Sequence, residues 1–517
     1  MNRALHINDV LAIIIEHAPK SSLPSLMRTS KTFFYPTARK LWKHCNTLMH
    51  LAKCLPESCI RCPNKSLEEG GRIVVTRHLT ADDVARFWLY ACLVRTLDFH
   101  LASVGVEHKS LQTIQTALPN QGIILFRNLQ TLHYIGPSLY SDFLPHLVPP
   151  TLEAIHMMFL PDDISDIMVP HADANIELAV LGVQNRHPTL AYTTTSLSLS
   201  CMFGRVQGLA DIIRGWDSLK ELVVVSNMDS VVLAVIFALP RLQQLTMCLP
   251  LSGQQALVHV PGTHAVCESL RTLKIAFTPL DAAAVKTVLA SLGTARLNEL
   301  MAAFMVDNQT NTIGSVCAAI EACCAADTLQ KIHLMSLPSV FRVQDAQHSG
   351  TWTLADIRPL LGYRNLSNVH LQPPRMFSAG DGDFRRMADA WPDLQSLRLG
   401  HTTDGLPACT LSGLIPLAQY APRLRTLSIM VDATTTAIRD DTLSSFPVQE
   451  SLVTLDVQLS PISAPADVAE FLSRLFPCLR EIKVLNGREA EVEIIRRRLW
   501  EDVEVGINAR WLSGVER

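Results

Sequence analysis

The sequence predicts an α/β fold made of a short all-helical module, a solenoid of alternating strands and helices, and a C-terminal capping helix. One apolar phrase recurs about every 28 residues across most of the chain, and helix-like segments fill the intervals. Residues 1–45 and 488–517 do not follow this repeat. A chain of 517 residues also exceeds what one hydrophobic core usually supports, which favours an extended array.

The predicted N-terminal module, residues 1–45, contains three short helices. The first has Asn8 as its N-cap, an apolar stripe formed by Val10, Leu11, Ile14 and Ile15, and an end at Pro19. The second is expected to run from Leu23 through Ser30 and the third to follow Pro36. Helices this short bury little apolar surface, so we expect a partner to complete their core.

This pattern resembles an F-box. The family's conserved places are filled here by Leu5, Ile7, Val10, Leu11, Leu23, Leu26, residues 30–33, Leu41 and Trp42, although the family's opening proline is missing and Asn8 stands near its place. The resemblance implies docking on a Skp-family adaptor, which links the protein to a cullin scaffold. The expected adaptor-binding residues are Leu5, Ile7, Val10, Leu11, Ile14, Leu23, Leu26, Leu41 and Trp42. The alternative is that these side chains pack on the first solenoid coil as an N-terminal cap.

Residues 46–93 are expected to form a helical linker, and residues 94–487 the solenoid. In each copy of this phrase an apolar residue is followed by two residues of any kind, a second apolar residue, one residue of any kind and a third apolar residue. Clear copies begin at Leu219, Leu242, Leu270, Leu297, Leu329, Leu366, Leu394, Leu424, Leu452 and Leu479, and looser copies at Val94, Leu129 and Leu152. Because 48% of the residues are hydrophobic, about one window in nine matches by chance. The regular period therefore carries the prediction, and the longer steps of 32 and 37 residues after Leu297 and Leu329 predict insertions.

Helix-like stretches at residues 282–292, 314–326 and 466–475 separate the phrases, and Pro392, Pro422 and Pro477 precede the next copy. Proline cannot continue a helix, so it marks the return to a strand. The repeat resembles the leucine-rich-repeat superfamily, which implies parallel strands on the concave face and helices outside. An ordinary α/β domain is the alternative. In the charged segment 488–517, Ile494, Ile495, Leu499 and Trp500 recur at helical spacing, as in a capping helix.

The order of the two resemblances, F-box then repeats, is similar to substrate receptors of SCF-type ubiquitin ligases, especially divergent fungal ones. A plain interaction scaffold without a ubiquitin-ligase role is the alternative. The target would be a protein bound by variable strand residues, for which we predict Lys220, Gln243, Arg271, Arg398, Arg425 and Lys483. These residues are mostly basic, so we expect an acidic target surface.

The sequence predicts no enzymatic activity, cofactor or metal. It contains no glycine-rich phosphate loop, nucleophile elbow or His-Glu-x-x-His helix. Cys59 and Cys62, with Cys45, His50 and Cys54 nearby, lack the second close pair that a zinc site usually has. Residues 380–383 lack the distal glutamate of a calcium loop and are expected to cap a helix. His156, His333 and His370 are explained by solvent-side strand positions.

Charge and hydropathy exclude further classes of function. A net charge of -3 argues against nucleic-acid binding, and the basic residues 496–498 lie among acidic ones. The longest apolar run, residues 231–239, is too short for a membrane, which needs about 20 residues. We expect a cytoplasmic or nuclear protein whose 13 cysteines are reduced thiols.

Overall fold

The computed structural model describes residues 8–514 apart from several internal segments. The segments it does not describe are 62–72, 101–105, 119–123, 137–143, 160–182, 202–207, 227, 229, 249–267, 276–281, 294, 306–311, 338–350, 401–406, 436–446 and 486–490. The chain divides into two units, Met1–Leu242 and Gln243–Arg517. The division falls inside the region predicted as a single solenoid.

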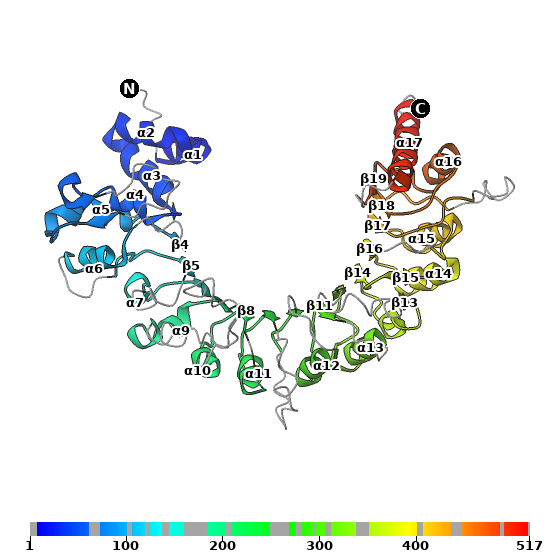
Figure 1. Ribbon diagram of the computed structural model, residues 1–517, viewed down its shortest axis with the longest axis horizontal. Coiled ribbons are helices and arrows are strands. Elements are labelled where there is room, and N and C mark those ends of the chain that lie inside the picture. Colours follow the sequence, from blue (N-terminus) through cyan, green and yellow to red (C-terminus); the bar gives the residue numbers. More distant parts are fainter. Residues whose placement is uncertain are drawn as a thin grey trace. The chain divides into compact units, whose positions relative to one another are not determined.

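The first unit begins with a helical module and continues as a parallel sheet (Figure 1). The module comprises α1 (Asn8–His17), η2 (Lys20–Ser22), α2 (Leu23–Thr29) and α3 (Lys31–Trp42). Its sheet runs in chain order through β1 (His44–Cys45), β4 (Thr96–His100), β5 (Thr131–Gly136), β6 (Ala154–Phe159), β7 (Ser196–Cys201) and β8 (Glu221–Val225). The connecting helices are α4 (Leu48–Ala52), η3 (Glu57–Cys59), α5 (Ala81–Ala91), α6 (His108–Thr116), α7 (Leu144–Leu147), α9 (Leu190–Thr193), α10 (Leu209–Ile213) and α11 (Ser230–Phe237). A small antiparallel pair, β2 (Ile60–Arg61) and β3 (Val74–Val75), lies between α4 and α5 in the chain.

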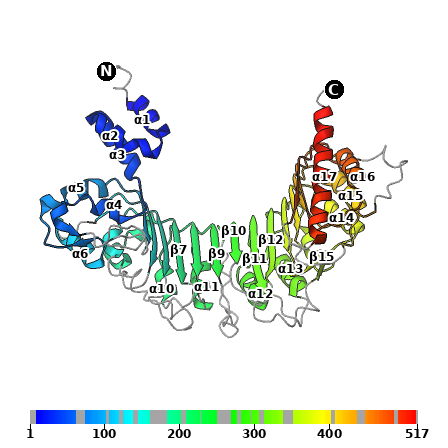
Figure 2. The same cartoon turned by 45° about the horizontal axis from the view of Figure 1, so that its top comes forward.

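The second unit repeats the same architecture (Figure 2). Its parallel strands are β9 (Gln244–Cys248), β10 (Thr272–Ile275), β11 (Glu299–Met305), β12 (Lys331–Leu337), β14 (Asn368–Gln372), β16 (Ser396–Leu399), β17 (Thr426–Ser428), β18 (Thr454–Gln458) and β19 (Glu481–Val484). The helices are α12 (Ala282–Ser291), α13 (Thr312–Cys323), η8 (Arg358–Gly362), α14 (Asp381–Ala390), η9 (Leu411–Gly413), α15 (Leu414–Tyr420), α16 (Pro465–Leu475) and α17 (Glu491–Gly514). Strand β13 (Thr351–Thr353) pairs with β15 (Met376–Ser378) in a separate two-stranded sheet.

Strand register confirms the predicted α/β solenoid in both units. Leu273 pairs with Leu300, and Leu300 pairs with Ile332, so equivalent places of successive phrases stand side by side. The leading residues of all the predicted phrases are buried as well. Each such side chain contributes roughly 1.5–3 kcal/mol by leaving water, and a phrase cannot bury its apolar face without neighbours.

The repeat predicted from the sequence did not include two of the strands, β7 and β1. In the coil of β7 the leading place is taken by Thr194, which is fully buried and donates its hydroxyl to the Leu152 carbonyl at 3.0 Å. Strand β1 pairs Cys45 with Leu97, so Trp42, three residues earlier, occupies the leading place of a further coil. The solenoid therefore begins inside the predicted module, and α4 and α5 of the predicted linker belong to its first coil.

The predicted insertions and helix ends also have structural counterparts. The 37-residue step contains β13, which adds a strand beside β15. Helices α14, α15 and α16 end at Ala390, Tyr420 and Leu475, two residues before the prolines. The third helix of the module is longer than predicted: it begins at Lys31, because the Ser30 hydroxyl accepts from the Phe33 amide, and Pro36 lies inside it.

The C-terminal helix α17 packs against α16 and β19. Trp500, Val503 and Ile507 are buried on this side, and the Trp500 indole N–H donates to the Ser460 carbonyl at 3.0 Å. Ile494 and Ile495 are exposed, so the prediction that they belong to the buried stripe of this helix is wrong. The helix covers the last apolar coil, which is the physical role of a cap.

Candidate functional site

The helical module has a small core of its own. Leu11, Ile15, Leu23 and Phe33 form it, and Leu26 and Leu41 pack against it while remaining partly exposed. The Lys40 ammonium donates to the carbonyls of Ile15, Glu16 and Ala18 at 2.6, 2.6 and 2.9 Å. A cation at these last carbonyls stabilises the end of α1.

The structure corrects the predicted adaptor-binding set at two positions. Leu11 is 2% exposed and Leu23 is fully buried, so neither can contact a partner while the module keeps this packing. They contribute to folding of the module instead. Val10 is half-buried, and Leu5 and Ile7 lie outside the described residues.

Trp42 contacts the solenoid. Its ring stacks on Tyr90 of α5, with centroids 4.9 Å apart and planes at 22°. The indole N–H is buried without an acceptor among the described residues. Trp42 thus joins the module to the first coil, as the capping alternative requires, and because the residue is only half-buried its assignment as an adaptor contact stays a prediction.

The exposed apolar surface of the module lies on α1 and α3. Ile13 and Tyr35 are each 57% exposed, and Ile14 is 39% exposed. Ile14 was predicted as a contact, whereas Ile13 and Tyr35 were missed because they fall outside the apolar stripe of their helices. An exposed apolar group of this kind is what a protein partner can bury.

The six predicted target-binding residues belong to two different rows. Lys220, Gln243, Arg271 and Arg425 follow the leading leucine directly, where the chain enters the strand. Arg398 and Lys483 lie at the centre of their strands, between two inward-pointing apolar residues. The second row, here called the strand-centre row, faces away from the core because strand side chains alternate.

The side chains of two of the six, Arg271 and Lys483, already interact with other groups of the chain. The Arg271 guanidinium donates to the carbonyls of Glu268 and Leu270 at 2.6 and 3.0 Å. Lys483 forms an ion pair with Glu481 at 3.3 Å. Arg398 is exposed and forms no ion pair among the described residues. Of the predicted set, Arg398 has the geometry best suited to a partner's carboxylate.

In the second unit the strand-centre row passes through Lys274, Met301, His333, His370 and Arg398 on successive strands. Lys274 is ion-paired with Glu299 of the neighbouring strand at 3.2 Å. The three histidines singled out in the sequence, His156 included, are half-buried at this strand surface.

Burial, with help from nearby cations, keeps the two histidines of this row neutral by lowering the pKa of each. Burial, together with His333 and Arg398, lowers the pKa of His370 to about 4. Burial also lowers the pKa of His333, with Lys274, Arg398 and Lys331 acting in the same direction and Glu299 against it. At neutral pH the positive charge of this row therefore resides on Lys274 and Arg398.

The cysteine and acidic motifs are accounted for by local hydrogen bonds. Cys59 is fully buried and donates to the Asp83 carboxylate at 3.6 Å, while Cys54 donates to the His50 carbonyl at 3.5 Å. Cys62 lies outside the described residues. Across the described ranges, His, Cys, Asp and Glu form no cluster of three or more that could hold a metal ion. The Gly380 amide donates to Asp383 at 3.0 Å, so this segment caps α14 as predicted.

Burial raises the pKa of Cys45 to about 11, which keeps this thiol protonated and unreactive. Where the structure describes the chain, it contains no helix that is both long and apolar enough to cross a bilayer.

Comparison with known proteins gives no family assignment. No family model matches the sequence, and no curated protein matches it. One similar solved structure is the yeast Rad7 and Elc1 complex, at 12% identity and a TM-score of 0.31, covering 89% of this chain and 88% of that chain. Another is an internalin from Listeria monocytogenes, at 10% identity and a TM-score of 0.36, covering 90% and 95%. At these values the class of the protein rests on its own strand register, which defines an α/β repeat solenoid.

Proposed function

We propose that this chain is the substrate-recognition subunit of an SCF-type ubiquitin ligase. Its helical module docks on a Skp-family adaptor, and through it on a cullin scaffold, while the repeat strands bind a target protein. The chain supplies proximity and orientation, and other subunits supply the chemistry. This role requires a location in the cytoplasm or the nucleus.

The exposed apolar group on the module, Ile13, Ile14 and Tyr35, carries this proposal. The module already buries its own core residues, so these side chains are not needed to complete it. Ile13 and Ile14 are 57% and 39% exposed, which together is about one full side chain, so burying both against a partner contributes roughly 1.5–3 kcal/mol to the interface. Leu26 and Leu41, partly exposed beside the core, extend the same kind of surface.

The test is a pull-down of a Skp-family adaptor with the full-length chain and with the double variant Ile13→Asp/Ile14→Asp. Deletion of residues 1–45 is unsuitable, because it also removes Trp42 and β1 from the first coil. We expect the double variant to reduce adaptor retention at least tenfold. Val231→Asp is the matched control, since Val231 on α11 is also 57% exposed. If the folded wild-type chain retains no adaptor, or the double variant retains it fully, the ligase proposal is wrong.

One observation favours a second function, that of a non-catalytic interaction scaffold. Trp42 stacks on Tyr90, and β1 extends the sheet directly from α3, so the module is continuous with the solenoid as a cap would be. A scaffold predicts that the double variant changes no adaptor interaction, yet target binding by the strands persists.

A further inference from the structure

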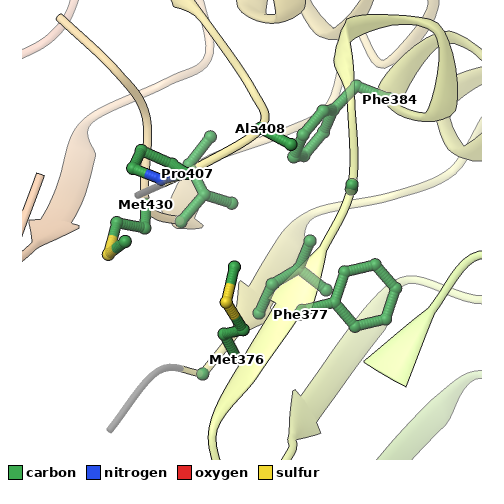
Figure 3. A pocket seen from close by; sticks show the side chains of 10 residues that line it. Met376, Phe377, Phe384, Pro407, Ala408 and Met430 are labelled. Atoms are coloured by element: carbon green, nitrogen blue, oxygen red, sulfur yellow. The ribbon is translucent and has the colours of Figure 1, made fainter. Parts of the chain in front are cut away.

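A small apolar pocket lies at the carboxyl ends of β14, β16 and β17 in the second unit. Figure 3 shows side chains from several segments around it: Met376 and Phe377 of β15, Phe384 of α14, Pro407, Ala408 and Met430. Leu399, Gly400, Ala379 and Ile429 complete the lining. The empty space of about 330 Å³ includes open solvent, and its enclosed part has room for only about one water molecule, so the pocket is a shallow apolar depression that a side chain can cover but that cannot enclose a small-molecule ligand.

The insertion in the solenoid creates this pocket. Strand β15 is held by β13, where Phe377 pairs with Trp352, and this places Met376 and Phe377 beyond the end of β14. At Gly400, which lines the pocket, the backbone of β16 approaches β14 closely: a Cβ there would lie 3.1 Å from the Cα of Gln372. Met376, Phe377 and Met430 remain partly exposed. Methionine side chains adapt to the shape of whatever apolar group they contact.

The pocket adjoins the positive end of the strand-centre row. Arg398 precedes Gly400 by two residues, a separation of roughly 7 Å along the strand. Lys331 is exposed on β12, two residues before His333, and His370 stands between His333 and Arg398 in the strand-centre row. No ion pair to Lys331 or Arg398 forms within the described ranges. The pocket thus lies next to a strand face that carries two cations without an ion pair among the described residues.

We propose that this surface binds an extended acidic segment of the target protein, one apolar side chain of which packs over the mouth of the pocket. Carboxylates of the segment pair with Arg398 and Lys331, and a Leu, Ile, Met or Phe side chain contacts Met376 and Met430. The proposal rests on the target-binding half of the proposed function and is independent of adaptor docking.

The arrangement of the cations favours carboxylates over a phosphoryl group. Phosphopeptide sites converge several arginines on one dianion. Here Arg398 stands on β16 and Lys331 on β12, with β14 between them, and Lys274 is already paired with Glu299. Single cations on strands that are not neighbours fit single carboxylates spaced along an extended chain. The neutral histidines of the strand-centre row, beside these cations, add hydrogen-bonding groups without adding charge.

The experiment is selection of peptides from a random twelve-residue displayed library on the immobilised full-length chain. We expect the enriched peptides to combine several Asp or Glu residues with one apolar residue. Affinities of the synthetic peptides are then measured by fluorescence anisotropy against four variants. Arg398→Glu removes the cation, and Ala408→Phe covers the mouth of the pocket from an exposed position. The matched controls are Arg364→Glu and Ala318→Phe, which make the same changes at exposed positions outside the surface.

We expect Arg398→Glu and Ala408→Phe each to weaken binding at least tenfold, and the controls to change it less than twofold. Enrichment of non-acidic peptides, binders unaffected by both variants, or no enrichment over empty beads would overturn the proposal. A peptide that binds tightly only when its acidic residues are replaced by phosphoserine would also overturn it, in favour of a phosphopeptide site. Because the adaptor pull-down depends on the helical module, loss of adaptor binding with these results intact would refute the ligase role alone.

Discussion

The strand faces of the two units share one scaffold and differ in charge. In the first unit His133 and His156 lie on adjacent strands and stack face to face, with ring centroids 4.6 Å apart. Asp98 pairs in register with His133, and Glu221 raises the pKa of His156 against the lowering effect of burial. This pair is therefore flanked by carboxylates.

The second unit places an equivalent pair in the opposite environment. His333 and His370 also lie on adjacent strands, at 5.4 Å and nearly perpendicular, but their neighbours are Lys331 and Arg398. The backbone register fixes where a strand-centre side chain stands, and packing does not constrain what that side chain is. A solenoid can thus present different partner chemistry in neighbouring regions without any change of fold.

The largest expected effect tests the shared scaffold. Leu132→Ala in β5 and Leu397→Ala in β16 each delete a fully buried side chain at the same place of the phrase. Each should lower the free energy of unfolding by about 2–5 kcal/mol, measured by urea denaturation. Ser198→Ala and Thr246→Ala, on the partly exposed strand face, should change it by less than about 0.5 kcal/mol. Clearly unequal losses for Leu132→Ala and Leu397→Ala would mean that the two units are not packed alike.

The next prediction concerns the two rows of the second unit. Arg398→Glu should weaken binding of a selected acidic peptide at least tenfold, which corresponds to about 1.4 kcal/mol. Arg425→Glu, at the strand entrance, should weaken it less than threefold, and the double variant should resemble Arg398→Glu alone. Equal effects at the two arginines, measured by fluorescence anisotropy, would show that the entrance row contributes to the target site.

The histidine pairs should also differ in their dependence on pH. His370 has a pKa of about 4 in the folded chain and about 6.5 in the unfolded chain, so the unfolded state binds more protons between these values. Stability must therefore fall as the pH drops from 6.5 towards 4, and His370→Gln should reduce that fall by on the order of 1 kcal/mol after allowance for solvent screening.

His156→Gln should have a smaller effect in the same direction, because Glu221 offsets part of the lowering of its pKa. Thermal unfolding at pH 7.0, 6.0 and 5.0 separates the two variants. A larger effect at His156 than at His370 would contradict the assigned difference in charge environment, which includes Lys274, Lys331, Arg398 and Glu299 around the second pair.

The solenoid could be predicted because its signal is repeated, whereas the surfaces could not. Each copy of the leucine phrase indicates the same pattern of buried residues, so many weak matches together give a strong prediction. Surface residues carry no such redundancy: helical spacing put Leu11 and Ile14 on one apolar stripe but could not show that Leu11 belongs to the module's own core. Ile14, on this stripe, and Ile13, off it, are both exposed.

The pocket had a signal that could not be interpreted from the sequence alone. The long step after Leu329 indicated an insertion, but its consequence depends on β15 pairing with β13 and on the close approach of Gly400 to Gln372. These are contacts between segments separated by more than 20 residues, and spacing within one phrase does not encode them.

The smallest expected effect tests why the β7 coil escaped the pattern. Thr194 fills the leading apolar place, and its hydroxyl donates to the Leu152 carbonyl inside the core. Thr194→Val keeps the shape and removes the donor, so the loss of the hydrogen bond, about 1 kcal/mol, is partly offset by the apolar methyl. We expect a net loss below about 1 kcal/mol in urea denaturation, and a larger loss for Thr194→Ala, which also leaves a cavity. Thr195→Val is the control, since the Thr195 hydroxyl contacts the Glu153 carbonyl at 3.4 Å in a half-exposed position.

If Thr194→Val instead lowers the free energy of unfolding by more than about 3 kcal/mol, the hydroxyl of Thr194 and not the packing of its side chain specifies this coil. The phrase is then not the common element of the two units.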